Sequence, residues 1–259
     1  MDVQPKSTAT LAYAPRPMLA LPPDVTISVV FPAYQEERFL TSAVRDVVAG
    51  LRPLGVPFEV IVVENGSTDG TRAEADALAV EFTEVRSLWI DAPDYGLALR
   101  HGLLSATNEY VVNFDVDLYD LDFACRAVSQ MDLPGGPSIV VGSKRGDGSV
   151  DNRHWTRQVV TGVFSGLLRY GFGLKVSDTH GMKAMRRADV LPVAQRCQFG
   201  TDLFDTELVL RTERAGFATA ELPVVIEEKR PARTPIVSRI LRTLRGLARL
   251  RVALWRSRS

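Results

Sequence analysis

Apolar and polar positions alternate along the first half of the chain in two distinct rhythms. Short apolar runs rich in β-branched residues predict buried strands at 25–31, 58–63 and 110–114. The segments 38–51 and 71–82 place apolar residues three and four positions apart, which predicts helices. We expect the first strand to stop at Pro32. This order of elements predicts an α/β domain with an open, mostly parallel, Rossmann-like sheet and helices on both faces.

Three polar clusters follow the predicted strands, at 32–36, at 64–71 and at Asp115 with Asp117. Ligands of open α/β sheets bind at the carboxyl ends of the strands, so one crevice can hold all three clusters. Carboxylates one residue apart suit a divalent cation such as Mg²⁺, which usually binds between one or two carboxylates and the phosphates of a substrate. The pair therefore indicates a nucleotide ligand, and the alternative interpretation is a solvated turn.

The first two clusters carry groups suited to a nucleoside. Glu64 can accept a hydrogen bond from the ring N–H of uracil or guanine, Tyr34 can stack on the base, and Glu36 can bind a ribose hydroxyl. The alternative is that 65–70 is only a turn that leads into a helix N-cap. Neither strand is followed by a Walker lysine or a Gly-x-Gly-x-x-Gly loop, which argues against a kinase, an ATPase and a dinucleotide dehydrogenase.

Composition indicates a globular protein of a reducing compartment. The 259 residues are 46% hydrophobic and 24% charged, which suffices for a large core. Cys125 and Cys197 have no metal-ligand spacing, so we expect neither a zinc site nor a disulfide framework. No apolar run approaches the roughly 18–20 residues that span a bilayer, and the N-terminus lacks the order of a signal peptide. We expect a cytoplasmic protein.

The net charge of zero conceals a strong asymmetry along the chain. Residues 229–259 contain ten basic and no acidic residues, so residues 1–228 carry a net charge of minus ten. Apolar residues of the tail recur at helical spacing with arginines elsewhere around the wheel, which predicts a basic amphipathic helix. We expect a flexible leader at 1–23, a catalytic domain at 24–233 and this helix at 234–259.

The tail has three interpretations that the sequence leaves open. It can bind a membrane surface peripherally, since each basic residue near an anionic leaflet adds about 1 kcal/mol. It can also dock on the acidic body as a lid, or bind a membrane-protein partner. Nucleic acid is not expected as a partner, because the basic stretch has a single aromatic residue, Trp255, and the remaining domain is acidic.

The motifs in order resemble those of a known family. Pro-Ala-Tyr-Gln-Glu at 32–36, the segment 59–71, Tyr-Gly-Leu-Ala-Leu-Arg-His-Gly-Leu at 95–103 and Asp-Val-Asp at 115–117 resemble the inverting family 2 glycosyltransferases of the GT-A fold. The downstream motifs at 141–144, 157–165, 176–183 and 220–224 are similar to the polyprenyl-phosphate (dolichyl-phosphate) mannosyl- and glucosyltransferases. The resemblance covers residues 25–235.

This resemblance implies a role for particular residues. Pro32, Tyr34, Glu36, Glu64, Asn65 and Asp115 would bind the nucleotide, and Asp115 and Asp117 would hold Mg²⁺ or Mn²⁺. Lys144, Arg157, Thr161 and Arg230 would bind the phosphate of the acceptor, and Asp117, Lys144 and Arg157 would act in catalysis. The family often has two aspartates after the second strand, where this chain has Glu64 and Asn65, so either residue can meet the base.

The expected activity is the transfer of a hexose, mannose or glucose, from a GDP- or UDP-linked donor to a polyprenyl phosphate at the cytoplasmic face of a membrane. A lipid phosphate is already an anion and needs cations, not a general base. One alternative is a related enzyme with a soluble or polysaccharide hydroxyl acceptor. Glu207 is a candidate base for that acceptor, although an acid on a helix surface is the simpler interpretation. A non-catalytic scaffold that binds a nucleotide sugar is the other alternative.

Overall fold

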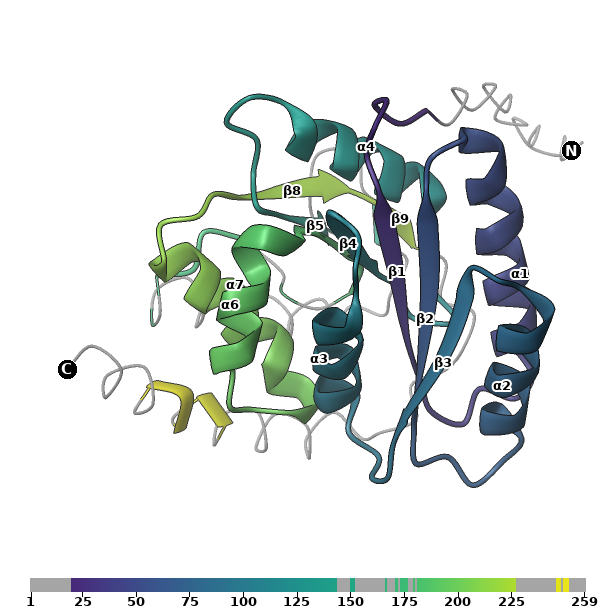
Figure 1. Cartoon of the computed structure of the whole chain (residues 1–259). Coiled ribbons are helices and arrows are strands. Elements are labelled where there is room, and N and C mark those ends of the chain that lie inside the picture. The colour runs from purple at the N-terminus through teal and green to yellow at the C-terminus, as the bar shows by residue number, and fades with distance from the viewer. Residues whose placement is uncertain are drawn as a thin grey trace, which may run out of the picture.

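The computed structural model describes residues 20–143, 150–151, 166, 171, 173–176, 179, 181–226, 246–247 and 249–251. Its main sheet has seven strands in the order β3-β2-β1-β4-β7-β5-β8 (Figure 1). The strand bounds are β1 Ile27–Ala33, β2 Phe58–Asn65, β3 Val85–Ile90, β4 Tyr110–Asn113, β5 Ile139–Ser143, β7 Lys183–Arg186 and β8 Thr219–Pro223. A separate short pair joins β6, Val150–Asp151, to β9, Val225–Ile226.

The sheet is mostly parallel, as the sequence predicts. Strands β3, β2, β1 and β4 run parallel to one another, and β5 is parallel to β8. Strand β7 alone among these seven runs antiparallel to its neighbours, β4 and β5. All the parallel neighbours of β1 therefore end at the same edge of the sheet, where the polar clusters follow.

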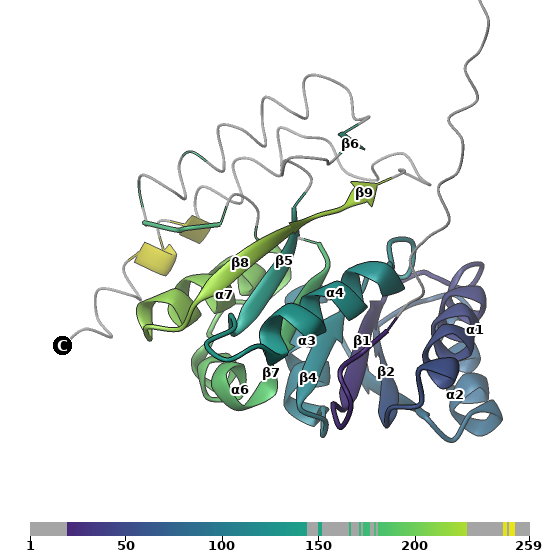
Figure 2. The same ribbon diagram turned by 90° about the horizontal axis from the view of Figure 1, so that it is seen from above.

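Helices cover both faces of the sheet (Figures 1 and 2). The helices α1 Leu40–Leu51, α2 Thr71–Glu81 and α4 Leu121–Asp132 contribute buried residues to one core cluster. The helices α3 Tyr95–Ser105, α6 Arg187–Arg196 and α7 Phe204–Arg214 contribute to a second. In α1 the buried positions recur three and four apart, which is the pattern that predicted this helix. Among the described segments, none of the helices has the length and apolarity needed to cross a membrane.

Part of the C-terminal tail packs against the second core cluster. Leu247 and Leu250 are buried and belong to the same cluster as Phe204 and Leu208. Arg249 and Arg251 are exposed. Other residues of the predicted tail helix, and all but the last few residues of the predicted leader, lie outside the described residues. For residues 246–247 and 249–251, the apolar side chains therefore bind the body of the protein.

One predicted boundary is wrong. The first strand does not stop at Pro32, because Pro32 lies inside β1 and pairs in register with Val63. The carbonyl of Val30 accepts a hydrogen bond from Phe114 N, so the backbone of Val30 is directed toward the β4 side. The backbone N of Pro32, two residues later, is on the same side. The β4 pairing has already ended at Val30 and Asn113, so the missing N–H of proline leaves no ladder bond unmade.

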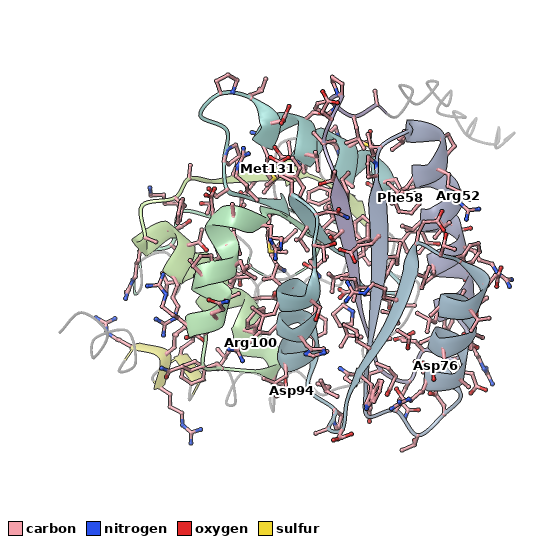
Figure 3. All side chains as sticks on the ribbon, viewed as in Figure 1. Arg52, Phe58, Asp76, Asp94, Arg100 and Met131 are labelled. Carbon is pink, nitrogen blue, oxygen red and sulfur yellow. The ribbon has the colours of Figure 1, made fainter. Side chains whose placement is uncertain are left out.

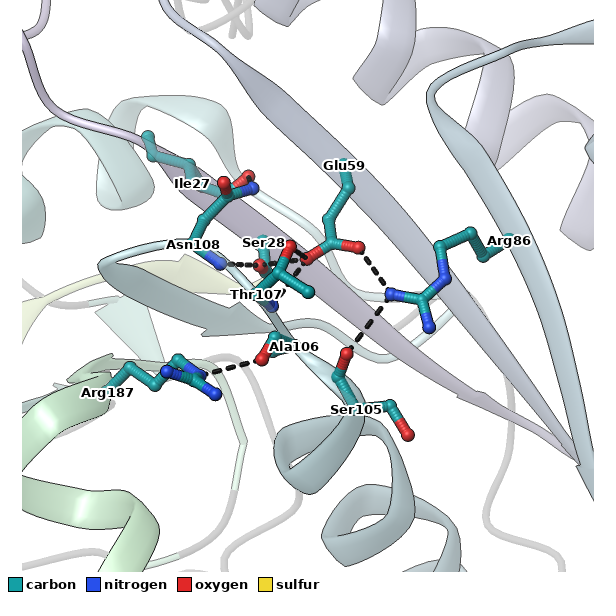
Figure 4. Close-up of polar contacts among 9 residues, drawn as sticks. All are labelled: Ile27, Ser28, Glu59, Arg86, Ser105, Ala106, Thr107, Asn108 and Arg187. Carbon is teal, nitrogen blue, oxygen red and sulfur yellow. Dashed lines mark hydrogen bonds and ion pairs between the residues drawn. The ribbon is translucent and has the colours of Figure 1, made fainter.

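A buried polar network holds the opposite, amino-terminal edge of the sheet (Figure 4). Glu59 Oε1 accepts hydrogen bonds of 2.7 Å from Ser28 Oγ, Thr107 N and Thr107 Oγ1, and Oε2 accepts one of 2.7 Å from Arg86 Nη1. Burial alone would raise the pKa of Glu59, but these hydrogen bonds outweigh it and lower the pKa below its ordinary value. The network fastens the segment between α3 and β4 to the sheet, which fixes where β4 begins.

Candidate active site

Two loops that the sequence singled out are joined at the carboxyl edge of the sheet. The loop after β1 adopts a positive φ of 58° at Gln35, whose backbone N donates to Ser67 Oγ at 3.0 Å and whose Nε2 donates to Thr68 Oγ1 at 2.7 Å. The next backbone N, that of Glu36, donates to Thr71 Oγ1 at 2.7 Å. The polar clusters after β1 and β2 therefore form one surface. Tyr34 is exposed on it, as a ring that stacks on a base must be.

The sequence left open whether Glu64 or Asn65 meets the base, and the structure separates their surroundings. Glu64 Oε1 already accepts a hydrogen bond of 2.5 Å from Ser67 N, which stabilises the turn after β2. Asn65 Oδ1 is buried and has no hydrogen-bond partner among the described residues. An unpartnered buried acceptor is costly unless a ligand supplies a donor. Among the described residues, Asn65 Oδ1 is therefore a candidate acceptor for a ligand.

The two aspartates after β4 lie in a tight turn. Asp115 and Leu118 exchange two backbone hydrogen bonds, of 3.2 Å from Asp115 N and 2.9 Å from Leu118 N, so Asp117 lies at the tip of the turn. Val116 between them is buried, and Asp115 and Asp117 are half-buried as whole residues. In register, Asn113 lies beside Val30, so Asp115 is at the same edge of the sheet as Ala33 and Glu64.

Behind Asp115 lies a group of polar side chains to which the sequence patterns assigned no role at the site. Tyr95 Oη donates to Asp115 Oδ1 at 3.0 Å, and Asn113 Nδ2 donates to Tyr95 Oη at 3.4 Å. Lys183 is completely buried, and its Nζ lies 3.0 Å from Asp205 Oδ1. Those two groups form an ion pair without hydrogen-bond alignment, since Asp205 Oδ1 has no hydrogen-bond partner within the described part of the chain.

Two of the three charges that act on Asp115 from described residues are negative. Asp205 and Asp117 are carboxylates, and Lys183 is an ammonium that is ion-paired with Asp205. Burial raises the pKa of Asp115 above its ordinary value; Lys183 and the Tyr95 hydroxyl oppose the rise, and the charges of Asp205 and Asp117 add to it. Burial and the charges of Asp115 and Asp205 also raise the pKa of Tyr95 well above its ordinary value, so its hydroxyl keeps its proton. The site is therefore suited to a cation.

The donor set fits Mg²⁺ or Mn²⁺ shared with a phosphate. In the described residues no group of three or more His, Cys, Asp or Glu side chains is placed to enclose a metal ion. Magnesium is usually held by one or two carboxylates together with substrate phosphates, so the pair Asp115 and Asp117 is enough. The hydroxyl of Tyr119, two residues after Asp117, donates a hydrogen bond of 2.7 Å to Asp46 of α1, so this side chain contacts α1.

Helix α3 begins at this site and ties it to the segment before α7. Asp94 is the N-cap of α3 and accepts from Leu97 N at 2.9 Å. The same carboxylate accepts from Thr201 N at 2.5 Å and Thr201 Oγ1 at 3.1 Å. Thr201 has a positive φ of 49°, which is rare for a β-branched residue. Figure 3 shows Asp94 at one end of α3, with Arg100 further along the helix, where it donates to the carbonyls of Ala194 and Gln195.

One interpretation of an acidic residue is wrong, and four predicted residues are not placed. Glu207 is not an acid on a helix surface, because it is completely buried. Its Oε2 accepts from Gln198 N and Phe199 N at 2.8 and 2.9 Å, and its Oε1 accepts from Arg211 Nε at 2.7 Å, so both oxygens serve the fold. The predicted acceptor-phosphate residues lie outside the described residues: Lys144, Arg157, Thr161 and Arg230.

Sequence comparison identifies the family to which this chain belongs. Residues 28–192 match Glycosyl transferase family 2, and this range contains the loops after β1 and β2 and both aspartates after β4. The chain belongs to glycosyl transferase family 2. As a family 2 glycosyltransferase it is an enzyme, as the motifs predicted.

Two curated relatives are similar to this family 2 glycosyltransferase over most of its length. Glycosyltransferase AglD of Haloferax volcanii is 32% identical over 231 residues, which are 87% of this chain and 37% of AglD. The chain therefore spans little more than a third of that relative. An uncharacterized glycosyltransferase of Mycobacterium tuberculosis is 31% identical over 202 residues, which are 76% of this chain and 84% of the relative.

Solved structures with the same architecture contain nucleotide and metal. Glucosyl-3-phosphoglycerate synthase from Mycobacterium tuberculosis, in complex with Mn²⁺, UDP and phosphoglyceric acid, has a TM-score of 0.63 at 24% identity and covers 84% of this chain and 74% of its own. The same synthase with Mg²⁺ and UDP has a TM-score of 0.59 at 23% identity, with 84% and 74% covered. This likeness confirms the expected GT-A fold of the family 2 glycosyltransferase.

Proposed function

We propose that this enzyme transfers a hexose, mannose or glucose, from a GDP- or UDP-linked donor to a polyprenyl phosphate at a membrane surface, with Mg²⁺ or Mn²⁺ as cofactor. The observation that carries the donor half is the group of carboxylates at the carboxyl end of β4, where Asp115 and Asp205 lie close to Lys183 and Asp117 follows in the same turn as Asp115. Solved proteins of this fold that hold UDP with Mn²⁺ or Mg²⁺ support the proposed binding of a nucleotide donor and a metal.

In this proposal the loops after β1 and β2 bind the nucleoside. Tyr34 stacks on the base, Asn65 Oδ1 accepts a base N–H, and Glu36 and Glu64 contact the ribose and the base edge beside Pro32. Asp115 and Asp117 hold the cation against the diphosphate. A bound divalent cation offsets the negative charge that grows on the leaving diphosphate. Lys183 is held by Thr179 O, Gly181 O and Asp205, so it adds positive charge to the site without moving.

The proposal of a polyprenyl phosphate acceptor is supported by the downstream sequence motifs. Lys144, Arg157, Thr161 and Arg230 would bind the phosphate of the lipid, since a guanidinium matches phosphate with a planar fork. Two anions must then approach each other, and cations that clamp the acceptor reduce their repulsion. No general base is needed. This agrees with the state of Glu207, whose oxygens are both occupied by N–H donors.

A second candidate is the same transfer to a small phosphorylated acceptor. Two observations favour it: Leu247 and Leu250 pack into the body, so they are not available for insertion into a membrane, and solved proteins of this fold hold phosphoglyceric acid. Both candidates use the same donor site, so donor and acceptor are tested separately.

The donor test is a thermal-shift panel with GDP, UDP, GDP-mannose and UDP-glucose, each with Mn²⁺ and with EDTA. A ligand that binds only the folded state adds about 2.7 kcal/mol of stability at a hundredfold excess over Kd. We expect a Mn²⁺-dependent rise in Tm with one nucleotide family, and loss of that rise in Asp117→Asn at an unchanged Tm of the free protein. The absence of a shift with all four ligands would favour the non-catalytic scaffold.

The acceptor test uses the donor so identified, labelled in the sugar. Enzyme is incubated with anionic vesicles that contain polyprenyl phosphate, and in parallel with 3-phosphoglycerate. Label that passes into organic solvent identifies the lipid product, and label that stays with a new water-soluble anion identifies the second candidate. Polyprenyl alcohol in place of the phosphate is the matched control, and equal transfer to it would contradict the role of the acceptor phosphate.

A further inference from the structure

We infer that Tyr95 is a positioning residue for the metal carboxylate Asp115: its hydroxyl orients one carboxylate oxygen and leaves the other directed toward the cation. The inference rests on the proposed function, because it assigns a role at the proposed metal site. It concerns a residue at the start of α3, twenty positions away in sequence from the aspartate that it contacts.

The hydrogen bond has a defined direction. Asn113 Nδ2 donates to Tyr95 Oη at 3.4 Å, which occupies an acceptor position of the hydroxyl. The hydroxyl proton is then available for Asp115 Oδ1, 3.0 Å away. An ionised carboxylate only accepts hydrogen bonds, so the phenol must be the donor of this pair. Asn113, Tyr95 and Asp115 therefore form a chain in which each hydrogen bond orients the next.

This hydrogen bond is the only one to the Asp115 carboxylate among the described residues. The nearby cation does not replace it, because Lys183 Nζ donates to Thr179 O at 3.2 Å and Gly181 O at 2.7 Å and forms its ion pair with Asp205. Lys183 thus acts on Asp115 through charge, which favours ionisation but does not set the direction of the oxygens. Tyr95 sets that direction.

The position of Tyr95 is itself well determined. Asp94 caps α3 directly before it and is bonded to Thr201, and the Cα of Gly96 directly after it lies against Gly200, Thr201 and Phe204, where a Cβ would approach these residues to 2.7 Å. The tyrosine is therefore held between two fixed residues. Groups that orient metal ligands in this way typically change metal affinity by about 10–100-fold when they are removed.

The test measures Mn²⁺ binding directly, from the electron paramagnetic resonance signal of free Mn²⁺ during a titration of the full chain with the nucleoside diphosphate bound. We expect Tyr95→Phe to raise the Kd for Mn²⁺ at least tenfold, because phenylalanine keeps the ring and removes the hydroxyl. Tyr110→Phe is the matched control. It removes a buried hydroxyl that donates to Asp132 at 2.9 Å, at the far end of β4, and should change the Kd less than twofold.

A double-mutant cycle separates positioning from a general loss of structure. In an Asp115→Asn background, Tyr95→Phe should cause little further loss of Mn²⁺ affinity, since the carboxylate that it orients is gone. An unchanged Kd in Tyr95→Phe, or full additivity with Asp115→Asn, would overturn the inference while leaving the metal site intact. Absence of Mn²⁺ binding by the unaltered protein would instead overturn the proposed function and the inference with it.

A kinetic measurement gives an independent readout. In Tyr95→Phe, the Mn²⁺ concentration that gives half-maximal transfer should rise, while the KM for the donor at saturating Mn²⁺ should stay near that of the unaltered enzyme. An equal loss of kcat at every Mn²⁺ concentration would contradict a role in positioning the metal ligand.

Discussion

At the scale of single residues, burial and hydrogen-bond partners decide which carboxylates hold the fold and which remain available for a ligand. Glu59 and Glu207 are buried and have both oxygens occupied by protein donors. The Asp115 carboxylate has one hydrogen bond among the described residues, and the residue lies in a turn at the carboxyl edge of the sheet. The spacing of Asp115 and Asp117 was visible in the sequence. The burial of Glu207 was not, because an acid in a helical pattern reads as a surface residue.

We predict that Glu59→Gln lowers the free energy of unfolding by about 2–3 kcal/mol, since the amide places a donor against the N–H and O–H groups that Glu59 accepts from. Urea denaturation at pH 7 measures the loss. Because the folded pKa of Glu59 lies below its ordinary value, its stabilising effect is complete above that value and decreases as the pH falls. The variant and the unaltered protein should therefore converge in stability as the pH decreases below about 4.5.

The matched control is Glu84→Gln. Arg52 lowers the pKa of Glu84 to about 2, chiefly through a direct side-chain hydrogen bond. This pair lies at the surface, where water screens it, so we expect a loss below about 1 kcal/mol. A loss in Glu84→Gln equal to that in Glu59→Gln would contradict the importance of burial at Glu59.

At the scale of secondary structure elements, the start of α3 is the part of the molecule that joins the predicted site to residues that the sequence did not reveal. The helix pattern of α1 and α2 was predicted to within a few residues because their apolar stripes are regular. Tyr95 and Lys183 were missed as site residues for a different reason. Each lies in a motif that supported the family resemblance without indicating a role at the site, and only the packing of α3 and β7 beside β4 brings them to Asp115.

We predict that Asp94→Ala lowers stability by about 1–2 kcal/mol and speeds amide hydrogen exchange in residues 198–203, because the carboxylate caps α3 and also accepts from Thr201. Exchange measured by mass spectrometry on peptides of this segment tests the prediction. Asp120→Ala is the matched control, since Asp120 caps α4 through Asp122 N and Phe123 N. It should cost a similar amount of stability without a change in exchange at 198–203.

At the scale of the whole molecule, the sheet separates the edge of the candidate site from an edge that a buried polar network holds. The loops after β1, β2 and β4 meet at the carboxyl edge, and the Glu59 network closes the amino edge. The sequence predicted the first through the alternation of strands and helices. The tail shows the limit of that approach. Its amphipathic pattern is equally compatible with binding to a membrane surface and with packing on the body of the protein. In the structure, Leu247 and Leu250 pack in the body.

We predict that Leu250→Ala lowers the free energy of unfolding by about 2–4 kcal/mol, because the side chain is completely buried in the core cluster of α7. The midpoint of urea denaturation measures this loss. Leu133→Ala removes an equally large but exposed side chain and should stay within about 0.5 kcal/mol of the unaltered protein. A Leu250 variant as stable as the Leu133 variant would show that the tail does not stabilise the body in solution.

The sequence by itself determined the α/β alternation, the sheet edge at which the polar clusters lie, the aspartate pair after β4 and the family. These follow from local patterns, because strand and helix periods and the residues at strand ends are encoded over a few neighbouring positions. Only the tertiary structure decided that Asn65 Oδ1 is buried without a partner in the described part of the chain, that Glu207 is a structural residue, and that Tyr95 and Lys183 lie beside Asp115. Those facts depend on contacts between segments far apart in the chain, and local patterns carry no record of which distant groups will meet.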